Sequence, residues 1–342
     1  MLESRLTELS ELVGRWMRPY VAPQGGPLDP FDAMLAYHVG WADQSGAMLD
    51  QPVGAGKRLR PALAILVCEA FGGSVEDARG PATAIELVHN FSLVHDDVQD
   101  QSDRRRGRPT VWALWGAAQA INVGDSLFAA AQIALTDHIS DDGRAVRASA
   151  IMNDTCRRLV GGQYLDLALE SALDATREHY ERMIDGKTAA LVQCSARLGA
   201  LMGGADQATE GACGEFGRLL GVAFQYQDDV LGVWGDPAVT GKPAGDDVRS
   251  KKKALPLITA LTTATGGQRD RLRHLCARDG LLADGEVEEV IGILDALDIR
   301  ARCQAEVERA FAVLIEALER AVRAERAGPL RELCEWILAR DR

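Results

Sequence analysis

The sequence predicts an all-α fold in a single domain spanning residues 1–342. Apolar residues recur at three- and four-residue steps, as in Leu87, Val88 and Phe91, and this spacing places them on one face of a helix. No segment alternates apolar and polar residues over the length of a half-buried strand. No linker rich in Pro, Gly or Ser is long enough to divide the chain, so we expect one helical domain.

Further helical patterns follow along the chain, near residues 145–170, 177–202, 207–233, 253–263 and 286–323. The clearest irregular stretch runs from Gly235 to Ser250 and includes Lys242. Because it directly follows an acidic cluster, our hypothesis is a mobile flap over a metal site. A plain connection between two helices is the alternative.

The charge distribution favours a small anionic ligand. A net charge of -12 argues against nucleic acid as a partner, because phosphate backbones require a basic footprint. Basic residues instead gather locally, at Lys57–Arg60, Arg104–Arg106 and Lys251–Lys253. Local cations in an acidic chain fit a small phosphate-bearing molecule better than a polymer.

Cysteine usage and the chain's apolar segments bear on location. The seven cysteines are scattered and form no C-x-x-C pair, so neither a disulfide framework nor a zinc site is expected, and a cytoplasmic location is predicted. The N-terminus lacks the apolar core of a signal peptide. No segment has the length and apolar character of a membrane span.

Two aspartate clusters carry the chemistry. The first is Asp96, Asp97 and Asp100, and the second is Asp228 with Asp229. On a helix Asp96 and Asp100 share a face, and like charges at this spacing are destabilising without a cation between them. Magnesium resolves the conflict, because it is bound by one or two carboxylates together with substrate phosphates. A solvated acidic helix face is the alternative for either cluster alone, and two helices that face each other would instead clamp a metal cluster.

Nearby cations indicate the ligand that the metal would hold. Arg105 and Arg106 follow the first cluster, and arginine forks match phosphate oxygens in pairs. Lys57 and Arg60 follow a glycine-containing segment that can close on an anion, although the spacing of a P-loop is absent. A basic surface run is the alternative for either group alone.

Taken together, these motifs resemble the trans-isoprenyl diphosphate synthases, also called polyprenyl synthetases. The resemblance rests on Gly-Lys-Arg-Leu-Arg-Pro at 56–61, the run from Glu86 to Asp100, Arg-Arg-Gly-Arg-Pro-Thr at 105–110, Gly-Lys-Thr at 186–188, and the run from Phe224 to Asp236. It covers roughly residues 50–260. It implies an all-α isoprenoid synthase fold, a helical bundle around a deep central cavity, which usually assembles as a homodimer. Ala55 stands where the family usually has glycine, which puts the approach of that loop in doubt.

The resemblance also implies roles for individual residues. Three Mg²⁺ ions would be held by Asp96, Asp97, Asp100, Asp228 and Asp229. An allylic diphosphate would be held by Arg105, Lys187, Thr188, Gln225, Lys242 and Lys251. Isopentenyl diphosphate would be held by Lys57, Arg60, His89 and Arg106. The five aspartates and Lys187 would form the catalytic set.

The expected reaction is head-to-tail prenyl transfer. The allylic C–O bond ionises as diphosphate departs, isopentenyl diphosphate attacks through its double bond, and the released diphosphate accepts the proton. Phe91 lies five residues before Asp96 on the same helix, next to the small Ser92, and could form the floor for the growing chain. In the family that the chain resembles, this pattern is typical of medium-chain synthases, which implies geranylgeranyl diphosphate as the product, with farnesyl diphosphate second. Core packing is the alternative role for Phe91.

Two rival functions remain open at this stage. A class I terpene cyclase also ionises a diphosphate, and Asn153–Asp154 begins its second motif, but Arg157 and Gly161 break the motif. A cyclase also has no need of a second diphosphate pocket. A non-catalytic subunit of a heteromeric synthase would tolerate the loss of aspartates, whereas both clusters here are intact.

Overall fold

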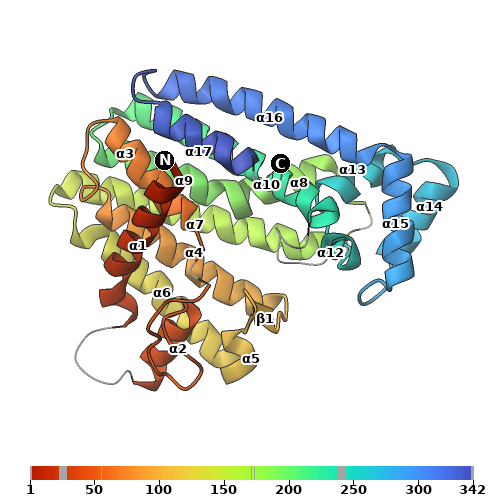
Figure 1. Ribbon diagram of the computed structural model, residues 1–342, viewed down its shortest axis with the longest axis horizontal. Coiled ribbons are helices and arrows are strands. Elements are labelled where there is room, and N and C mark those ends of the chain that lie inside the picture. The colour runs from red at the N-terminus through yellow and green to blue at the C-terminus, as the bar shows by residue number, and fades with distance from the viewer. Residues whose placement is uncertain are drawn as a thin grey trace. The chain divides into compact units, whose positions relative to one another are not determined.

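The structure is a computed structural model that describes residues 2–22, 29–54, 56–170, 172, 174–236 and 244–339. Helices make up nearly all of its regular secondary structure (Figure 1). The only named strands in these ranges are β1 (Arg104–Arg105) and β2 (Arg108–Pro109), which pair as a short antiparallel hairpin. The prediction of an all-α fold is confirmed. None of the described helices is both long enough and apolar enough to cross a membrane.

The chain forms two compact units. Unit 1 comprises Met1–Asp154 and Cys194–Gly211, and unit 2 comprises Thr155–Gln193 and Ala212–Arg342. Their boundaries fall inside the helices α7 (Asp142–Glu170), α9 (Ala190–Met202) and α10 (Gln207–Trp234). The single-domain organisation expected from the sequence stays a prediction.

Unit 1 is built around a pair of long helices. It contains α1 (Leu2–Val21), α2 (Pro30–His38), α3 (Leu59–Ala70), α4 (Arg79–Gln99), α5 (Val111–Trp115) and α6 (Ala117–Asp137). The helices α4 and α6 pack along each other. Gly124 of α6 makes the close approach possible, because a Cβ there would lie 2.2 Å from Nε2 of His95. The buried face of α4 includes Leu87, Val88 and Phe91, as the apolar spacing predicted.

Unit 2 contains the remaining helices. They are α8 (Arg177–Ile184), α12 (Asp246–Arg249), α13 (Leu255–Thr263), α14 (Gly266–Cys276), α15 (Asp284–Ala296), α16 (Ile299–Ala321) and α17 (Gly328–Leu338). Its core gathers buried side chains from α8, α10, α13, α15 and α16, with Tyr180 fully buried among them.

Two expected helical stretches are more complex than their sequence pattern. The stretch near 177–202 contains η1 (Asp185–Ala189), a π-helical turn between α8 and α9. The stretch near 286–323 divides into α15 and α16, because Asp298 adopts a left-handed conformation with φ 53°. A π-turn widens the helix locally, and such turns occur often at functional sites.

The irregular stretch from Gly235 to Ser250 is partly helical. The short helix α12 occupies Asp246–Arg249, which the glycine and proline content did not indicate. Residues 237–243, including Lys242, lie outside the described residues, and the flap stays a hypothesis.

The contact between α7 and η1 depends on a glycine. A Cβ on Gly162 would lie 2.1 Å from the backbone nitrogen of Lys187 and 2.5 Å from the carbonyl carbon of Gly186. No real side chain tolerates such distances, so a larger residue would push the helix away from the π-turn.

We therefore expect Gly162→Ala to lower the free energy of unfolding by about 1–3 kcal/mol through overpacking. Gly161→Ala is the matched control, because nothing lies within 4 Å of a Cβ at that position on the same helix. The control should be neutral or should stabilise by up to about 1 kcal/mol, since alanine is the better helix former. Urea unfolding of both variants measures the difference, and equal effects would contradict the packing argument.

Candidate active site

The first acidic cluster lies at the C-terminal end of α4. Asp96 and Asp97 are in its last turn, and Asp100 is the C-cap residue. The C-terminal end of a helix carries partial negative charge, so three carboxylates there repel both the helix dipole and one another. The location therefore strengthens the argument that a cation is needed.

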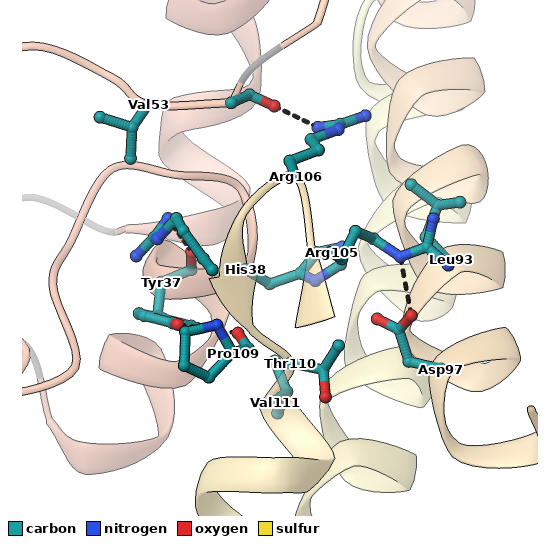
Figure 2. A pocket seen from close by; sticks show the side chains of 12 residues that line it. Tyr37, His38, Val53, Leu93, Asp97, Arg105, Arg106, Pro109, Thr110 and Val111 are labelled. Atoms are coloured by element: carbon teal, nitrogen blue, oxygen red, sulfur yellow. Dashed lines mark hydrogen bonds and ion pairs between the residues drawn. The ribbon is translucent and has the colours of Figure 1, made fainter. Parts of the chain in front are cut away.

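The two adjacent aspartates of this cluster differ in environment. Asp97 is 2% exposed and accepts a hydrogen bond of 2.7 Å from Nε of Arg105 (Figure 2). Burial raises the pKa of Asp97, and the charge of Arg105 opposes that shift. Asp96 is half-buried and Asp100 is exposed. Asp97 is therefore held by the protein itself, and the other two carboxylates lie nearer the surface.

The β1–β2 hairpin presents two arginines in different directions. Arg105 pairs with Arg108 across the hairpin, and the turn residues Arg106 and Gly107 both have positive φ, at 52° and 76°. This is the pattern of a type I′ turn. Figure 2 shows Arg105 directed at Asp97, while the Arg106 guanidinium donates to the Gly54 carbonyl.

A buried ion pair anchors the segment that carries Lys57 and Arg60. Arg58, in a left-handed conformation with φ 45°, lies 3.6 Å from the Glu86 carboxylate, and both side chains are about 95% buried. Arg58 also donates to the Ser10 carbonyl. The neighbouring Lys57 is exposed, and Arg60 is half-buried. Arg58 is thus fixed in the interior, while the cations on either side of it lie nearer the surface.

The structure brings His89 and Arg60 together. The Nη1 atom of Arg60 lies 3.5 Å from Nε2 of His89. Burial, together with the positive charges of Arg60 and Arg106, lowers the pKa of His89 well below its usual value. His89 is therefore neutral at pH 7 and can act on a ligand only through a hydrogen bond.

The hairpin forms part of the lining of a small pocket in unit 1. Its walls include His38, Gly54, Asp97, Arg105 and Arg106 (Figure 2). Burial lowers the pKa of His38 to about 3, and the charges of Arg105 and Arg106 act in the same direction. No sequence pattern had singled out His38, because its importance comes only from its neighbours in space.

The second acidic cluster lies near the end of α10 in unit 2. Asp228 is exposed, whereas Asp229 is 1% exposed. Asp229 accepts hydrogen bonds from the Tyr180 hydroxyl (2.6 Å), the Leu255 backbone nitrogen (2.8 Å) and Nε2 of Gln225 (2.7 Å). Burial raises the pKa of Asp229, while the charge of Lys252 and these donors oppose the shift. Both clusters therefore pair a buried, bonded carboxylate with a more exposed one.

The π-turn carries the next two predicted site residues. Nζ of Lys187 lies 2.5 Å from Oδ2 of Asp166, on α7. The Thr188 hydroxyl donates to Oε1 of Gln225 at 2.7 Å. Lys187, Thr188, Gln225 and Asp229 thus belong to one region of unit 2, as the sequence predicted for a shared site.

The lysines of the run at 251–253 have different partners. Nζ of Lys251 donates to the Arg278 carbonyl. Lys252 instead lies 3.7 Å from Asp247. Burial acts to lower the pKa of Lys252, but the charges of Asp229, Asp247 and Asp228 outweigh burial and raise it. Lys252 therefore pairs with Asp247, and the charges of the second acidic cluster also favour its protonated form. The sequence alone could not separate it from its neighbours.

Backbone strain concentrates beside the predicted site residues. Of the five non-glycine residues with positive φ in the described chain, four are themselves predicted site residues or lie within two positions of one: Arg58, Gln101, Arg106 and Lys251. Such conformations cost roughly 1–3 kcal/mol each and persist where the surrounding structure enforces them, often at functional sites.

The donor set fits magnesium rather than a metal held by protein alone. Among the described residues, no three acidic, histidine or cysteine side chains form a ready-made metal cage. Magnesium does not need one, because it binds one or two carboxylates and completes its shell with water and substrate phosphate oxygens. Carboxylates at a helix end beside arginine and lysine suit that shared coordination.

A larger groove in unit 2 includes none of the predicted site residues in its lining. It has a volume of about 810 Å³ and is lined by α10, α16 and α17, with Leu231, Trp234 and Phe311 among its walls. Of the acidic residues in the run from Asp228 to Asp236, only Asp236 lines it. The groove therefore gives no support to the predicted site residues.

The helical fold and the paired carboxylates with nearby cations define a class of enzyme that handles diphosphates with divalent metal. Comparison with known proteins is specific. The family model described as polyprenyl synthetase matches residues 44–294. A geranylgeranyl diphosphate synthase of Mycobacterium tuberculosis is 41% identical over 296 residues, which cover 85% of this chain and 83% of the relative.

Two further similarities extend over almost the whole chain. A (2E,6E)-farnesyl diphosphate synthase of Mycobacterium bovis is 38% identical over 330 residues, 94% of this chain and 90% of the relative. The crystal structure of a polyprenyl synthetase from Streptomyces coelicolor A3(2) matches with a TM-score of 0.88 at 35% identity, covering 98% of both chains. The chain therefore belongs to the polyprenyl synthetase family and is a prenyltransferase.

The resemblance found in the sequence is confirmed, and neither rival function is favoured by these matches. Enzymes of this family depend on magnesium and use isopentenyl diphosphate together with an allylic diphosphate.

The environment of His38 predicts a pH dependence of stability. Its pKa is about 3 in the folded protein and roughly 6.5 when unfolded, so between these values the unfolded chain binds one more proton. The free energy of unfolding should therefore fall as pH decreases below 6.5, by at most about 1.4 kcal/mol per pH unit from this group. Urea unfolding at several pH values should show a shallower loss in His38→Gln. Parallel curves for the two proteins would contradict the prediction.

Proposed function

We propose that this enzyme condenses isopentenyl diphosphate with an allylic diphosphate to give geranylgeranyl diphosphate and diphosphate, with farnesyl diphosphate as the second candidate product. The observation that supports this most directly is the division of labour in both aspartate pairs. In each cluster one carboxylate is buried and hydrogen-bonded within the protein, as Asp97 and Asp229 are, while Asp96, Asp100 and Asp228 lie nearer solvent.

The more exposed carboxylates are the better candidates for metal ligands. Asp96 and Asp100 in unit 1 and Asp228 in unit 2 would hold Mg²⁺, while Asp97 and Asp229 would act by fixing neighbouring side chains. When bound, the metal ions neutralise the diphosphate that leaves as the allylic C–O bond breaks. A set of three ions, expected from the family resemblance, is part of this proposal.

The cations divide between the two substrates. Arg105, Lys187, Thr188 and Gln225 would hold the allylic diphosphate, and we place Lys252 with them in preference to Lys251. In the arrangement seen here Lys187 is paired with Asp166, so it would exchange this carboxylate for a phosphate. Lys242 lies outside the described residues, and its part stays a prediction.

The second substrate would use the cations of unit 1. Lys57, Arg60 and Arg106 would hold isopentenyl diphosphate, and the neutral His89 would add a hydrogen bond. Fixing the attacking double bond next to the allylic carbon converts an encounter in solution into an intramolecular reaction. The proton lost at the end would pass to the departing diphosphate.

The environment of Phe91 supports its role as the floor. The ring is 8% exposed and packs edge-on against Phe128 of α6, with ring centroids 5.3 Å apart. It also meets the His95 ring at 5.5 Å. The adjacent Ser92 donates to the His89 carbonyl and leaves little bulk. Rings packed in this way would resist displacement by a growing prenyl chain, which fits a product of medium length.

Exposed apolar side chains in unit 1 support assembly with a second copy. Ile121 and Ile133 of α6 are 46% and 55% exposed, and Val146 of α7 is 70% exposed. A homodimer would remove this surface from water. Sedimentation of the purified protein tests the assembly, and a monomer at micromolar concentration would argue against it.

The absence of disulfides among the seven cysteines supports the cytoplasmic location expected from the sequence.

The deciding experiment is incubation with Mg²⁺, isopentenyl diphosphate and, separately, dimethylallyl, geranyl or farnesyl diphosphate, followed by analysis of product chain length. Geranylgeranyl or farnesyl diphosphate as the end product supports the proposal. Hydrocarbon released from one allylic substrate alone would indicate a cyclase, and no turnover with any pair would indicate a non-catalytic subunit.

For product length, we expect Phe91→Ala to shift the distribution toward longer chains, because the variant removes the ring proposed as the floor. Phe311→Ala is the control, since this half-buried ring of α16 is outside the proposed site. Circular dichroism should verify folding first, as loss of a buried phenyl ring costs roughly 3–5 kcal/mol. An unchanged product pattern in Phe91→Ala would remove Phe91 from its proposed role.

For the lysine run, Lys252→Met should raise the KM for the allylic diphosphate by about tenfold or more, the value of one hydrogen bond to a charged group. Lys251→Met is the matched control, because its ammonium is directed to the Arg278 carbonyl. Steady-state kinetics of the two variants decide between them. A larger effect at Lys251 would restore the assignment made from the sequence.

A further inference from the structure

The carboxylate of Asp229 is bonded almost completely by the protein. Its Oδ2 accepts from the Tyr180 hydroxyl at 2.6 Å and from the Leu255 nitrogen at 2.8 Å, and its Oδ1 accepts from Gln225 at 2.7 Å. A carboxylate offers about four lone-pair positions, so three of them are used. Asp229 thus acts as a hub that joins α8, α10 and the start of α13.

The hub determines how two predicted phosphate ligands are oriented. An ionised carboxylate can only accept hydrogen bonds, so the Gln225 amide must turn its nitrogen toward Asp229 and its oxygen toward Thr188. The Thr188 hydroxyl donates to that oxygen at 2.7 Å. A continuous line of hydrogen bonds therefore runs from Tyr180 through Asp229 and Gln225 to Thr188.

The Tyr180 end of this line is held rigidly. The side chain is fully buried, and its ring stacks on Tyr226 with centroids 6.1 Å apart and an interplanar angle of 21°. The Arg177 guanidinium lies 5.8 Å from the Tyr180 ring and 5.0 Å from the Tyr226 ring, and it donates to the Tyr226 hydroxyl at 2.7 Å. Burial and the charge of Asp229 raise the pKa of Tyr180, so its hydroxyl keeps the proton that it donates.

We propose that Tyr180 is a positioning residue for the second half of the active site, acting through Asp229 to orient Gln225 and Thr188 for the diphosphate. This inference rests on the proposed function of that site. No motif in the sequence pointed to Tyr180, which touches neither substrate nor metal in this scheme. Residues of this kind hold catalytic side chains within fractions of an ångström of the productive geometry.

The test compares Tyr180→Phe with Tyr226→Phe. Each variant removes one buried or half-buried hydroxyl and keeps the aromatic ring, but only Tyr180 bonds Asp229. The first readout is calorimetric binding of inorganic pyrophosphate in the presence of Mg²⁺, which requires no turnover. We expect the affinity to fall by about tenfold in Tyr180→Phe, the usual effect of losing such a supporting hydrogen bond. In Tyr226→Phe the affinity should stay within roughly twofold of the wild type.

The second readout separates positioning from stability. In the condensation assay, Tyr180→Phe should raise the KM for the allylic diphosphate and the Mg²⁺ concentration for half-maximal rate, at a temperature where thermal unfolding shows both variants fully folded. A purely structural role would lower the melting temperature of both variants and leave these constants alike. Equal pyrophosphate affinity in Tyr180→Phe and Tyr226→Phe would overturn the proposal.

A double-mutant cycle with Asp229→Leu, which removes both acceptor oxygens, provides an independent check. If Tyr180 acts through Asp229, Tyr180→Phe should have no further effect on pyrophosphate affinity when Asp229 is already replaced. Additive losses would show that Tyr180 acts by another route. Should Tyr180→Phe fail to fold, Asp229→Leu alone still tests the line of hydrogen bonds. If Asp229 orients Gln225, Asp229→Leu and Gln225→Ala should lower the pyrophosphate affinity by similar factors.

The binding measurement keeps the two proposals separate. If the wild-type protein binds pyrophosphate with Mg²⁺ but condenses no substrate pair, the proposed function fails while the role of Tyr180 remains measurable. If wild-type turnover is normal and Tyr180→Phe matches Tyr226→Phe in every constant, only the positioning role fails.

Discussion

A buried carboxylate must find hydrogen-bond donors inside the protein, and this requirement organises both acidic clusters. Asp97 takes its donor from Arg105, and Asp229 takes three donors from Tyr180, Leu255 and Gln225. Leaving either charge unpaired would be strongly destabilising. Two of these donors, Arg105 and Gln225, are themselves predicted substrate ligands, so satisfying the buried charge also orients side chains of the proposed site.

The backbone around the site departs from regular helix in ways that serve the same end. The π-turn at Asp185–Ala189 displays Lys187 and Thr188 in succession. Positive φ at Arg58 and Arg106 changes the chain's direction beside the cations of unit 1. Irregular backbone of both kinds thus lies beside predicted site residues, as is common at functional sites.

Burial changes the chemistry of two histidines in unit 1. Surrounding arginines and loss of water keep His38 and His89 neutral. A cationic histidine there would add to charge that Arg60, Arg105 and Arg106 already supply. The positive potential therefore comes from arginines, which cannot lose their charge, and the histidines contribute directional hydrogen bonds whose character does not change near pH 7.

Sequence reasoning predicted the helical class, the two acidic clusters and the family, because helical periodicity and short motifs are local properties of the chain. It placed Arg60 with His89, and Gln225 with Thr188, in shared sites, and the structure brings both pairs together. It could not predict that Asp229 is buried and Asp228 exposed, because burial depends on packing against residues distant in the sequence.

By itself, then, the sequence determined which residue types are present and at what helical spacing, and that was enough to define the chemistry. Only the tertiary structure decided which aspartate of each cluster is buried, that Lys252 pairs with Asp247, and that Tyr180 donates a hydrogen bond to Asp229. The physical reason is that desolvation and hydrogen-bond partners depend on neighbours distant in the chain, and Tyr180 reaches Asp229 only through folding.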